Sequence, residues 1–108
     1  MAYSEALAQR IRAVLGDSPV TEKKMFGGIA FMIGGNMAVG VSGDGLMVRV
    51  GLDAYAKTLE EPNVTPFGPA DRPMRGWVLV DADGIATDEA LAGWVERGMA
   101  FASTLPPK

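Results

Sequence analysis

The sequence predicts a two-layer α+β domain in which three helices pack on an antiparallel sheet of four to five strands. Apolar residues repeat with helical spacing near both ends of the chain, and they alternate with a period of two through its middle. Glycine-rich turns separate the alternating runs, as tight hairpins require. The expected order, α-β-β-β-α-β-β-α, is typical of an antiparallel sheet with helices packed on it.

The first helix is expected over residues 4–15. Ser4 suits the N-cap because its hydroxyl can accept a hydrogen bond from a free backbone N–H group. Gly16 can adopt the left-handed conformation that ends a helix. The helix has one apolar stripe with i, i+4, i+7 and i+8 spacing, formed by Leu7, Ile11, Val14 and Leu15.

Three consecutive strands are expected near residues 24–33, 37–42 and 46–50. Bulky apolar residues occupy every second position in the last two, so one face of the sheet is bulky and apolar. Two glycine-rich turns, 34–36 and 43–45, supply the positive-φ residues that join neighbouring antiparallel strands. These segments form a meander.

The second half of the chain repeats these signals. Asp53 is expected to cap a helix over 53–61, and a proline-rich loop with a short edge strand near 64–67 follows it. Residues 77–80 are apolar on both parities, which is typical of a strand covered on both faces. A last amphipathic helix is expected near 88–103.

Length and composition favour one cytoplasmic domain. A chain of 108 residues buries enough surface to fold as a single unit over residues 1–108. It contains no cysteine and no histidine, which excludes disulfides, thiolate nucleophiles, Cys/His zinc sites and imidazole catalysis. The N-terminus has no signal-peptide pattern, and no apolar run approaches the ~20 residues that span a bilayer. We therefore expect a cytoplasmic protein that does not enter a membrane.

The motifs of catalytic and cofactor sites are incomplete. Residues 81–84 begin like a calcium loop but lack its later ligands, and Ser42 lies outside a G-x-S-x-G pattern. Gly27 and Gly28 do not belong to a phosphate loop, and they indicate a bulge or a tight packing site in a strand. A net charge of −3 disfavours direct nucleic-acid binding, which usually needs a basic surface. We expect no metal, no cofactor and no enzymatic activity.

Several segments resemble a known family. The run Lys24-Met25-Phe26-Gly27-Gly28, which precedes an apolar strand and a Gly-Gly-Asn turn, resembles the TfoX N-terminal domain, as do Leu46–Val50 and Arg72–Val78. The resemblance covers nearly the whole chain and implies a small stand-alone member, because the full-length regulators carry a second, C-terminal domain. It implies the fold helix, three strands, helix, two strands, helix. It also implies an association with regulators of DNA uptake and natural competence, which act on transcription with another activator.

Basic side chains give the main binding hypothesis. Lys24 and Arg49 lie on expected strands, and Arg72 and Arg75 flank the entry to Trp77, so a meander can gather them at one end or face of the sheet. Arginines gathered there would bind a carboxylate or phosphate group, for example on a protein partner. The alternative is ordinary solvated charge paired with nearby acids. The predicted binding residues are Lys24, Met25, Phe26, Gly27, Gly28, Arg49, Arg72, Arg75 and Trp77.

The sequence favours a non-enzymatic binding or interaction domain with a regulatory role and a protein partner, with a homodimer as a further option. The alternative is an enzyme or small-ligand-binding protein that uses a cleft near Phe26–Gly28 and Arg72–Trp77. A closed pocket with converging buried charges would favour this alternative, whereas a flat exposed apolar patch would favour the interaction domain.

Overall fold

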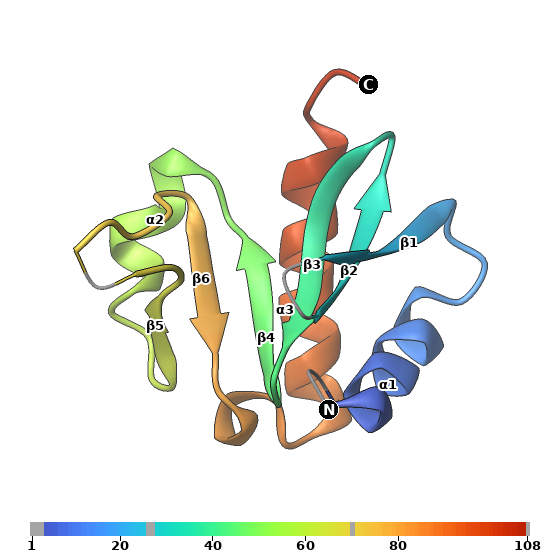
Figure 1. Ribbon diagram of the computed structural model, residues 1–108, viewed down its shortest axis with the longest axis horizontal. Helices are drawn as coiled ribbons and strands as arrows, with labels where there is room; N and C mark the ends of the chain where they lie inside the picture. The colour runs from blue at the N-terminus through green and yellow to red at the C-terminus, as the bar shows by residue number, and fades with distance from the viewer. Residues whose placement is uncertain (1–3, 26–27, 70, 108) are drawn as a thin grey trace.

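The computed structural model describes residues 4–25, 28–69 and 71–107, and only the backbone of Met25. Within these residues, helices accompany a six-stranded sheet (Figure 1). The helices are α1 (Glu5–Leu15), α2 (Leu52–Thr58) and α3 (Asp88–Ser103), with a 3-10 helix, η1 (Ala82–Ile85). The strands are β1 (Val20–Met25), β2 (Gly28–Ile33), β3 (Asn36–Ser42), β4 (Gly45–Arg49), β5 (Val64–Pro66) and β6 (Trp77–Val80).

The sheet is antiparallel throughout and has the order β1-β2-β3-β4-β6-β5. The helix α3 passes behind β3 and β4 in the view of Figure 1, and α1 packs beside it on the same face. The helix α2 lies next to β6. The two-layer α+β class is therefore confirmed, with α1 and α3 on one face of the sheet.

The sheet has six strands, so the expected number of four to five is too low. The segment 24–33, expected as one strand, belongs to two strands that run in opposite directions, because Met25 pairs with Gly28. Gly28 begins β2 and does not form a bulge within a longer strand; the register shift of β2 lies between Phe31 and Met32. The sequence of β1, VTEKKM, has no apolar alternation because an edge strand with exposed side chains needs none.

The helix ends agree with the sequence in two of three places. The backbone N–H of Leu7 donates to Ser4 Oγ at 3.1 Å, and Gly16 ends α1 with a φ of 55°. Asp53, however, does not cap α2. The helix begins one residue earlier, after Gly51, and it has no side-chain cap. The positive φ of Gly51, 86°, is required by the packing described below.

The hydrophobic core fills the space between the sheet and the pair α1 and α3. The helices contribute Leu7, Ile11, Leu91, Trp94 and Val95, and the sheet contributes Ile29, Phe31, Val39, Val41, Leu46, Val48, Val78 and Val80. Gly98 lets α3 approach β3, because a Cβ atom there would clash with the Ala38 carbonyl oxygen and the Val39 side chain. This close approach brings α3 against the sheet, where it contacts β3 and β4.

Candidate functional site

Two glycines form a corner where β4 ends and β6 begins. The backbone N–H groups of Val50 and Gly51 both donate to the carbonyl oxygen of Gly76, at 2.8 and 3.1 Å. Gly51 has a φ of 86° and Gly76 a φ of 89°, a conformation that favours glycine. A Cβ atom on Gly76 would lie 3.5 Å from the Gly51 carbonyl carbon, so the two segments nearly touch. The corner therefore holds the end of β4 against the start of β6.

Arg49 lies at this corner on two aromatic rings. Its Cζ atom is 5.1 Å from the centroid of Trp77, its cross-strand neighbour, and 5.8 Å from that of Phe101 on α3. The Phe101 ring packs on the bare Cα of Gly51, where any side chain would overlap it. None of the ion pairs among the described residues includes Arg49. The guanidinium thus lies against two rings, and no acid of the described residues forms an ion pair with its N–H edge.

Exposed apolar side chains flank the same corner. Leu52 and Met74 are the exposed large apolar residues of the described chain, with 71% and 42% of their surface accessible. Leu52 directly follows Gly51, and the Met74 carbonyl accepts a hydrogen bond from the Trp77 N–H at 3.1 Å. We call this region the corner surface; its residues are Arg49, Leu52, Met74, Trp77 and Phe101.

A small apolar hollow adjoins the corner surface. It has a volume of about 350 Å³ and is lined by Val50, Gly51, Leu52, Asp53, Ala54 and Phe101. Phe101 therefore contributes to both features, with Arg49 near its ring and the hollow beside it. We call this feature the anchor hollow.

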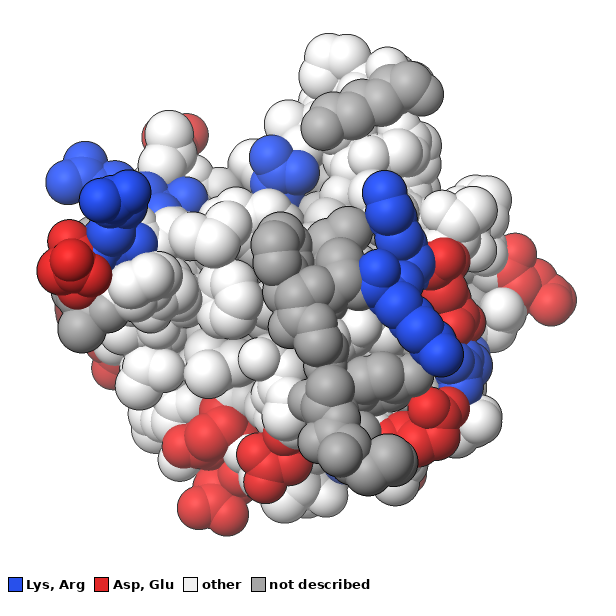
Figure 2. Space-filling view, in the orientation of Figure 1, with Lys and Arg blue, Asp and Glu red and all other residues white. Residues whose placement is uncertain are grey.

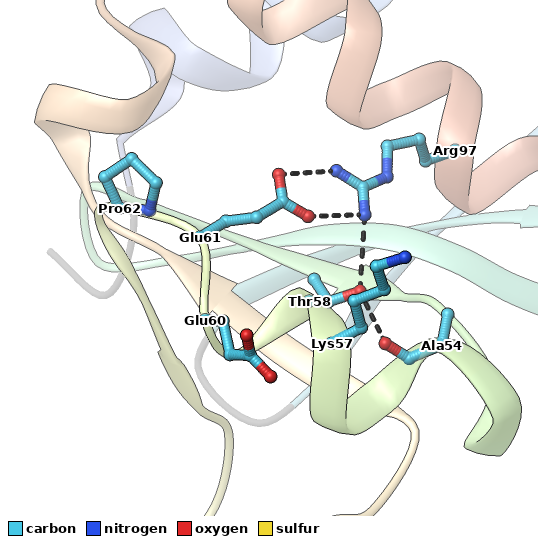
Figure 3. Close-up of a pocket in the computed structure, with 7 residues that line it drawn as sticks. All are labelled: Ala54, Lys57, Thr58, Glu60, Glu61, Pro62 and Arg97. Atoms are coloured by element: carbon cyan, nitrogen blue, oxygen red, sulfur yellow. Dashed lines mark hydrogen bonds and ion pairs between the residues drawn. The ribbon is translucent and has the colours of Figure 1, made fainter.

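A larger hollow, of about 620 Å³, lies between α2 and α3, and Figure 3 shows the side chains that line it. Arg97 reaches from α3 and donates to both carboxylate oxygens of Glu61, at 3.1 and 2.9 Å, and to Thr58 Oγ1 at 3.3 Å. The Arg97 Cζ atom also lies 4.2 Å from the centroid of Trp94. Thr58 is only 1% exposed and donates to the Ala54 carbonyl at 2.7 Å. These four residues, Thr58, Glu61, Trp94 and Arg97, form what we call the clasp.

A family model described as the TfoX N-terminal domain matches residues 13–102. The chain belongs to this family. No curated protein and no solved structure matches it. The corner surface and the clasp both lie within the matched residues of this TfoX N-terminal domain.

The domain does not bring Lys24 next to Arg49. Lys24 is exposed on β1 and pairs with Ile29, whereas Arg49 lies on β4, with β2 and β3 between the two strands. Three strand spacings separate them by about 14 Å or more. Figure 2 shows the basic side chains of this face in separate groups, with several acids along its lower edge. Lys24 on β1 and Arg49 at the corner are therefore separate, and Arg72 and Arg75 lie in the loop that precedes Gly76.

Nor does the sheet bring Gly28 to the 72–77 segment. Gly28 is buried at the start of β2, next to Ile29. Through the pairing of β2, β3, β4 and β6, Ile29 lies level with Val80, at the end of β6 opposite to Trp77. Arg72 and Arg75 are exposed in the loop that leads into the corner, and neither belongs to an ion pair of the described chain. Two further predicted residues, Phe26 and Gly27, and the side chain of Met25 lie outside the described residues.

Three residues of the corner surface are absent from the sequence-based set: Leu52, Met74 and Phe101. Phe101 lies seven positions after Trp94, on the same stripe of α3, so helical spacing offers a signal for it. The clasp offers no local signal, because Glu61, in the turn after α2, and Arg97, on α3, are 36 residues apart and meet only in the folded domain.

The described part of the domain has neither a metal-binding cluster nor a membrane-spanning helix. No group of three or more His, Cys, Asp or Glu side chains there is arranged to hold a metal ion. None of the helices in the same residues combines the length and apolar composition needed to cross a membrane. Asp81 caps η1, since its carboxylate accepts a hydrogen bond from the Gly84 N–H at 3.1 Å.

Proposed function

We propose that this TfoX N-terminal domain is a non-enzymatic regulatory domain that binds an acidic group of a cytoplasmic protein partner at the corner surface. The observation that carries the proposal is the state of Arg49, which rests on Trp77 and Phe101 and belongs to no ion pair of the described chain. A guanidinium stacked on aromatic rings keeps its N–H edge available, and a carboxylate fits this edge with two parallel hydrogen bonds.

The composition of the corner surface supports a protein as the partner. Arginine, tryptophan and methionine are enriched at the centres of protein interfaces. Leu52 and Met74 offer apolar surface that a phosphate backbone cannot cover, and the net charge of −3 opposes binding to nucleic acid. The regulatory role follows from the family, and the absence of histidine and cysteine favours binding over catalysis.

Charge reversal at Arg49 tests the proposal. Arg49→Glu is expected to abolish the capture of a partner from native lysate, because it places two carboxylates opposite each other, and to leave the far-ultraviolet circular dichroism unchanged. Lys24→Glu makes the same change of charge on β1 and is expected to retain the partner. The readout is quantitative mass spectrometry of the captured proteins. Equal capture by wild type and Arg49→Glu would end the proposal.

A further inference from the structure

We infer that the partner segment is acidic and carries a bulky apolar side chain beside its carboxylates, and that this side chain enters the anchor hollow. This inference rests on the proposed function, since it names the partner chemistry of the same surface. Three observations carry it: the clasp, the anchor hollow with its exposed rim, and the two arginines of the loop that leads into the corner.

The clasp shows how an arginine on an aromatic ring is completed in this domain. Arg97 lies 4.2 Å above the Trp94 ring, and the Glu61 carboxylate caps its edge with hydrogen bonds of 3.1 and 2.9 Å. Arg49 has the rings of Trp77 and Phe101 but no carboxylate among the ion pairs of the described residues. An aspartate or glutamate of the partner supplies the missing group, with its oxygens against the N–H edge of Arg49.

The anchor hollow explains why an acid alone is an incomplete ligand. Its volume of about 350 Å³ lies within the range of small binding pockets, and its lining is mainly apolar. Leu52 is 71% exposed at its rim, which leaves a large apolar side chain in water. A leucine, isoleucine or phenylalanine placed in the hollow buries Leu52 and contacts Phe101, whose ring also supports Arg49. Arg49 and the anchor hollow therefore bind neighbouring side chains of one partner segment.

The number of arginines favours a segment with several acids over a single chain end. Arg72 and Arg75 lie in the loop that ends at Gly76, and like Arg49 they belong to no ion pair in the part of the chain that the structure describes. Arg75 adjoins Gly76 in the sequence, so a segment seated at the corner can meet more than one guanidinium group, whereas a chain terminus carries a single carboxylate. A nucleic acid would leave the anchor hollow and Leu52 without an apolar partner.

Selection from a displayed library of short random peptides on the immobilised full chain tests the inference. The expected consensus has one bulky apolar residue flanked by aspartate or glutamate. Fluorescence anisotropy then measures the Kd of the best synthetic peptide, with an amidated C-terminus, against four variants. Leu52→Ala removes the rim, Ala54→Leu partly fills the hollow, and Arg49→Gln removes the charge. Ala56→Leu makes the same change as Ala54→Leu at an exposed position of α2 that does not line the hollow.

We expect Leu52→Ala, Ala54→Leu and Arg49→Gln each to weaken binding by about tenfold or more, and Ala56→Leu to leave the Kd unchanged. Acidic peptides that depend on Arg49 but ignore Leu52 and Ala54 would overturn the inference and leave the proposed function standing. Basic consensus sequences, insensitivity to Arg49→Gln or a failure to enrich any peptide would overturn both. Loss of binding on amidation would overturn the inference and identify the C-terminal carboxylate of a chain as the ligand. A concentration-dependent dimer that dissociates in the Leu52→Ala variant would also overturn the inference, because the occupant of the surface would then be a second copy of this chain.

Discussion

Among the described residues, two arginines rest on tryptophan rings, and one of these two, Arg97, also pairs with a carboxylate there. Arg97 joins α3 to α2 through Glu61 and Thr58, and its pair lies within the domain. Arg49 joins β4 to β6 and α3 only through the faces of Trp77 and Phe101. The same side-chain type therefore serves cohesion at the clasp and is left available at the corner.

The origin of the carboxylate distinguishes the two arginines. A structural arginine such as Arg97 pairs with an acid of the same domain, whereas a binding arginine pairs with an acid of its partner. At the clasp, Glu61 lies in the turn after α2 and already pairs with Arg97, so Arg97 needs no further ordering when the domain binds a ligand. At the corner, stacking restricts Arg49 before any partner arrives, which lowers the entropy that binding must overcome. Removing either arginine should thus affect different properties of the molecule.

The largest expected effect comes from the corner glycine. Gly51→Ala is expected to lower the free energy of unfolding by about 2–3 kcal/mol, because an L-residue is strained at a φ of 86° and its Cβ displaces the Phe101 ring. Urea denaturation measures this change. The variant should also weaken partner capture, since Arg49 loses one of its two rings.

Gly43→Ala is the matched control for Gly51→Ala. Gly43 also has a positive φ, 59°, but a Cβ atom there meets nothing within 4 Å. It should cost only the backbone strain, about 1 kcal/mol. Equal losses at the two glycines would show that the contact between Gly51 and Phe101 does not organise the corner.

A crossed pair of substitutions tests the comparison itself. Arg97→Gln is expected to cost about 1 kcal/mol of stability, because it removes a bidentate ion pair and a stacked ring contact at partial exposure. Arg49→Gln should cost less than half of that, since no acid is left without its partner. Partner binding should show the reverse order, with Arg49→Gln defective and Arg97→Gln close to wild type.

The crossed experiment has two clear ways to fail. A large stability loss with Arg49→Gln would make Arg49 a structural residue like Arg97. A binding loss with Arg97→Gln, in a variant whose circular dichroism is unchanged, would place the partner in the hollow between α2 and α3. Either result would remove the distinction drawn between the two sites.

The parts of the fold that follow from the sequence are those where burial imposes a period. The stripe of α1 and the alternation of β3 and β4 both face the core, so their apolar spacing reveals them. The apolar pattern does not predict β1 as a separate strand, because β1 is an exposed edge strand with a polar sequence. The predicted cap of α2 at Asp53 is wrong. The residue before the helix is Gly51, where the packing of Phe101, distant in the sequence, leaves no room for a side chain.

The site was predictable only where it lies on adjacent strands. The sequence predicts both Arg49 and Trp77 as binding residues, and the β4–β6 register places them side by side. Phe101 and Leu52 were missed because they reach the corner through the packing of α3 and the start of α2. Lys24 was grouped with Arg49 because a meander was expected, whereas the edge position of β1 keeps them apart.

The smallest effect concerns a third arginine, which has carboxylates but no ring contact in the described residues. Arg12 joins α1 to β1, donating from Nε and Nη2 to Glu22, both at 2.8 Å, and from Nη1 to Glu5 at 3.0 Å. The hydrogen bond from Arg12 holds the pKa of Glu22 below its ordinary value. The pair therefore stabilises the domain fully above the ordinary glutamate pKa of about 4.3, and this contribution disappears as the pH falls through the lowered pKa.

Glu22→Gln should accordingly be less stable than wild type near neutral pH, by about 0.5 kcal/mol because the pair is partly exposed. The difference should vanish in acid, once the pH lies below the lowered pKa of Glu22 and the wild-type carboxylate is also protonated. Urea titrations at a series of pH values measure it, and added salt should shrink it. A difference that persists in acid would mean that Glu22 stabilises the fold through packing. The ion pair with Arg12, which has no ring contact among the described residues, would then not be the source of the stability.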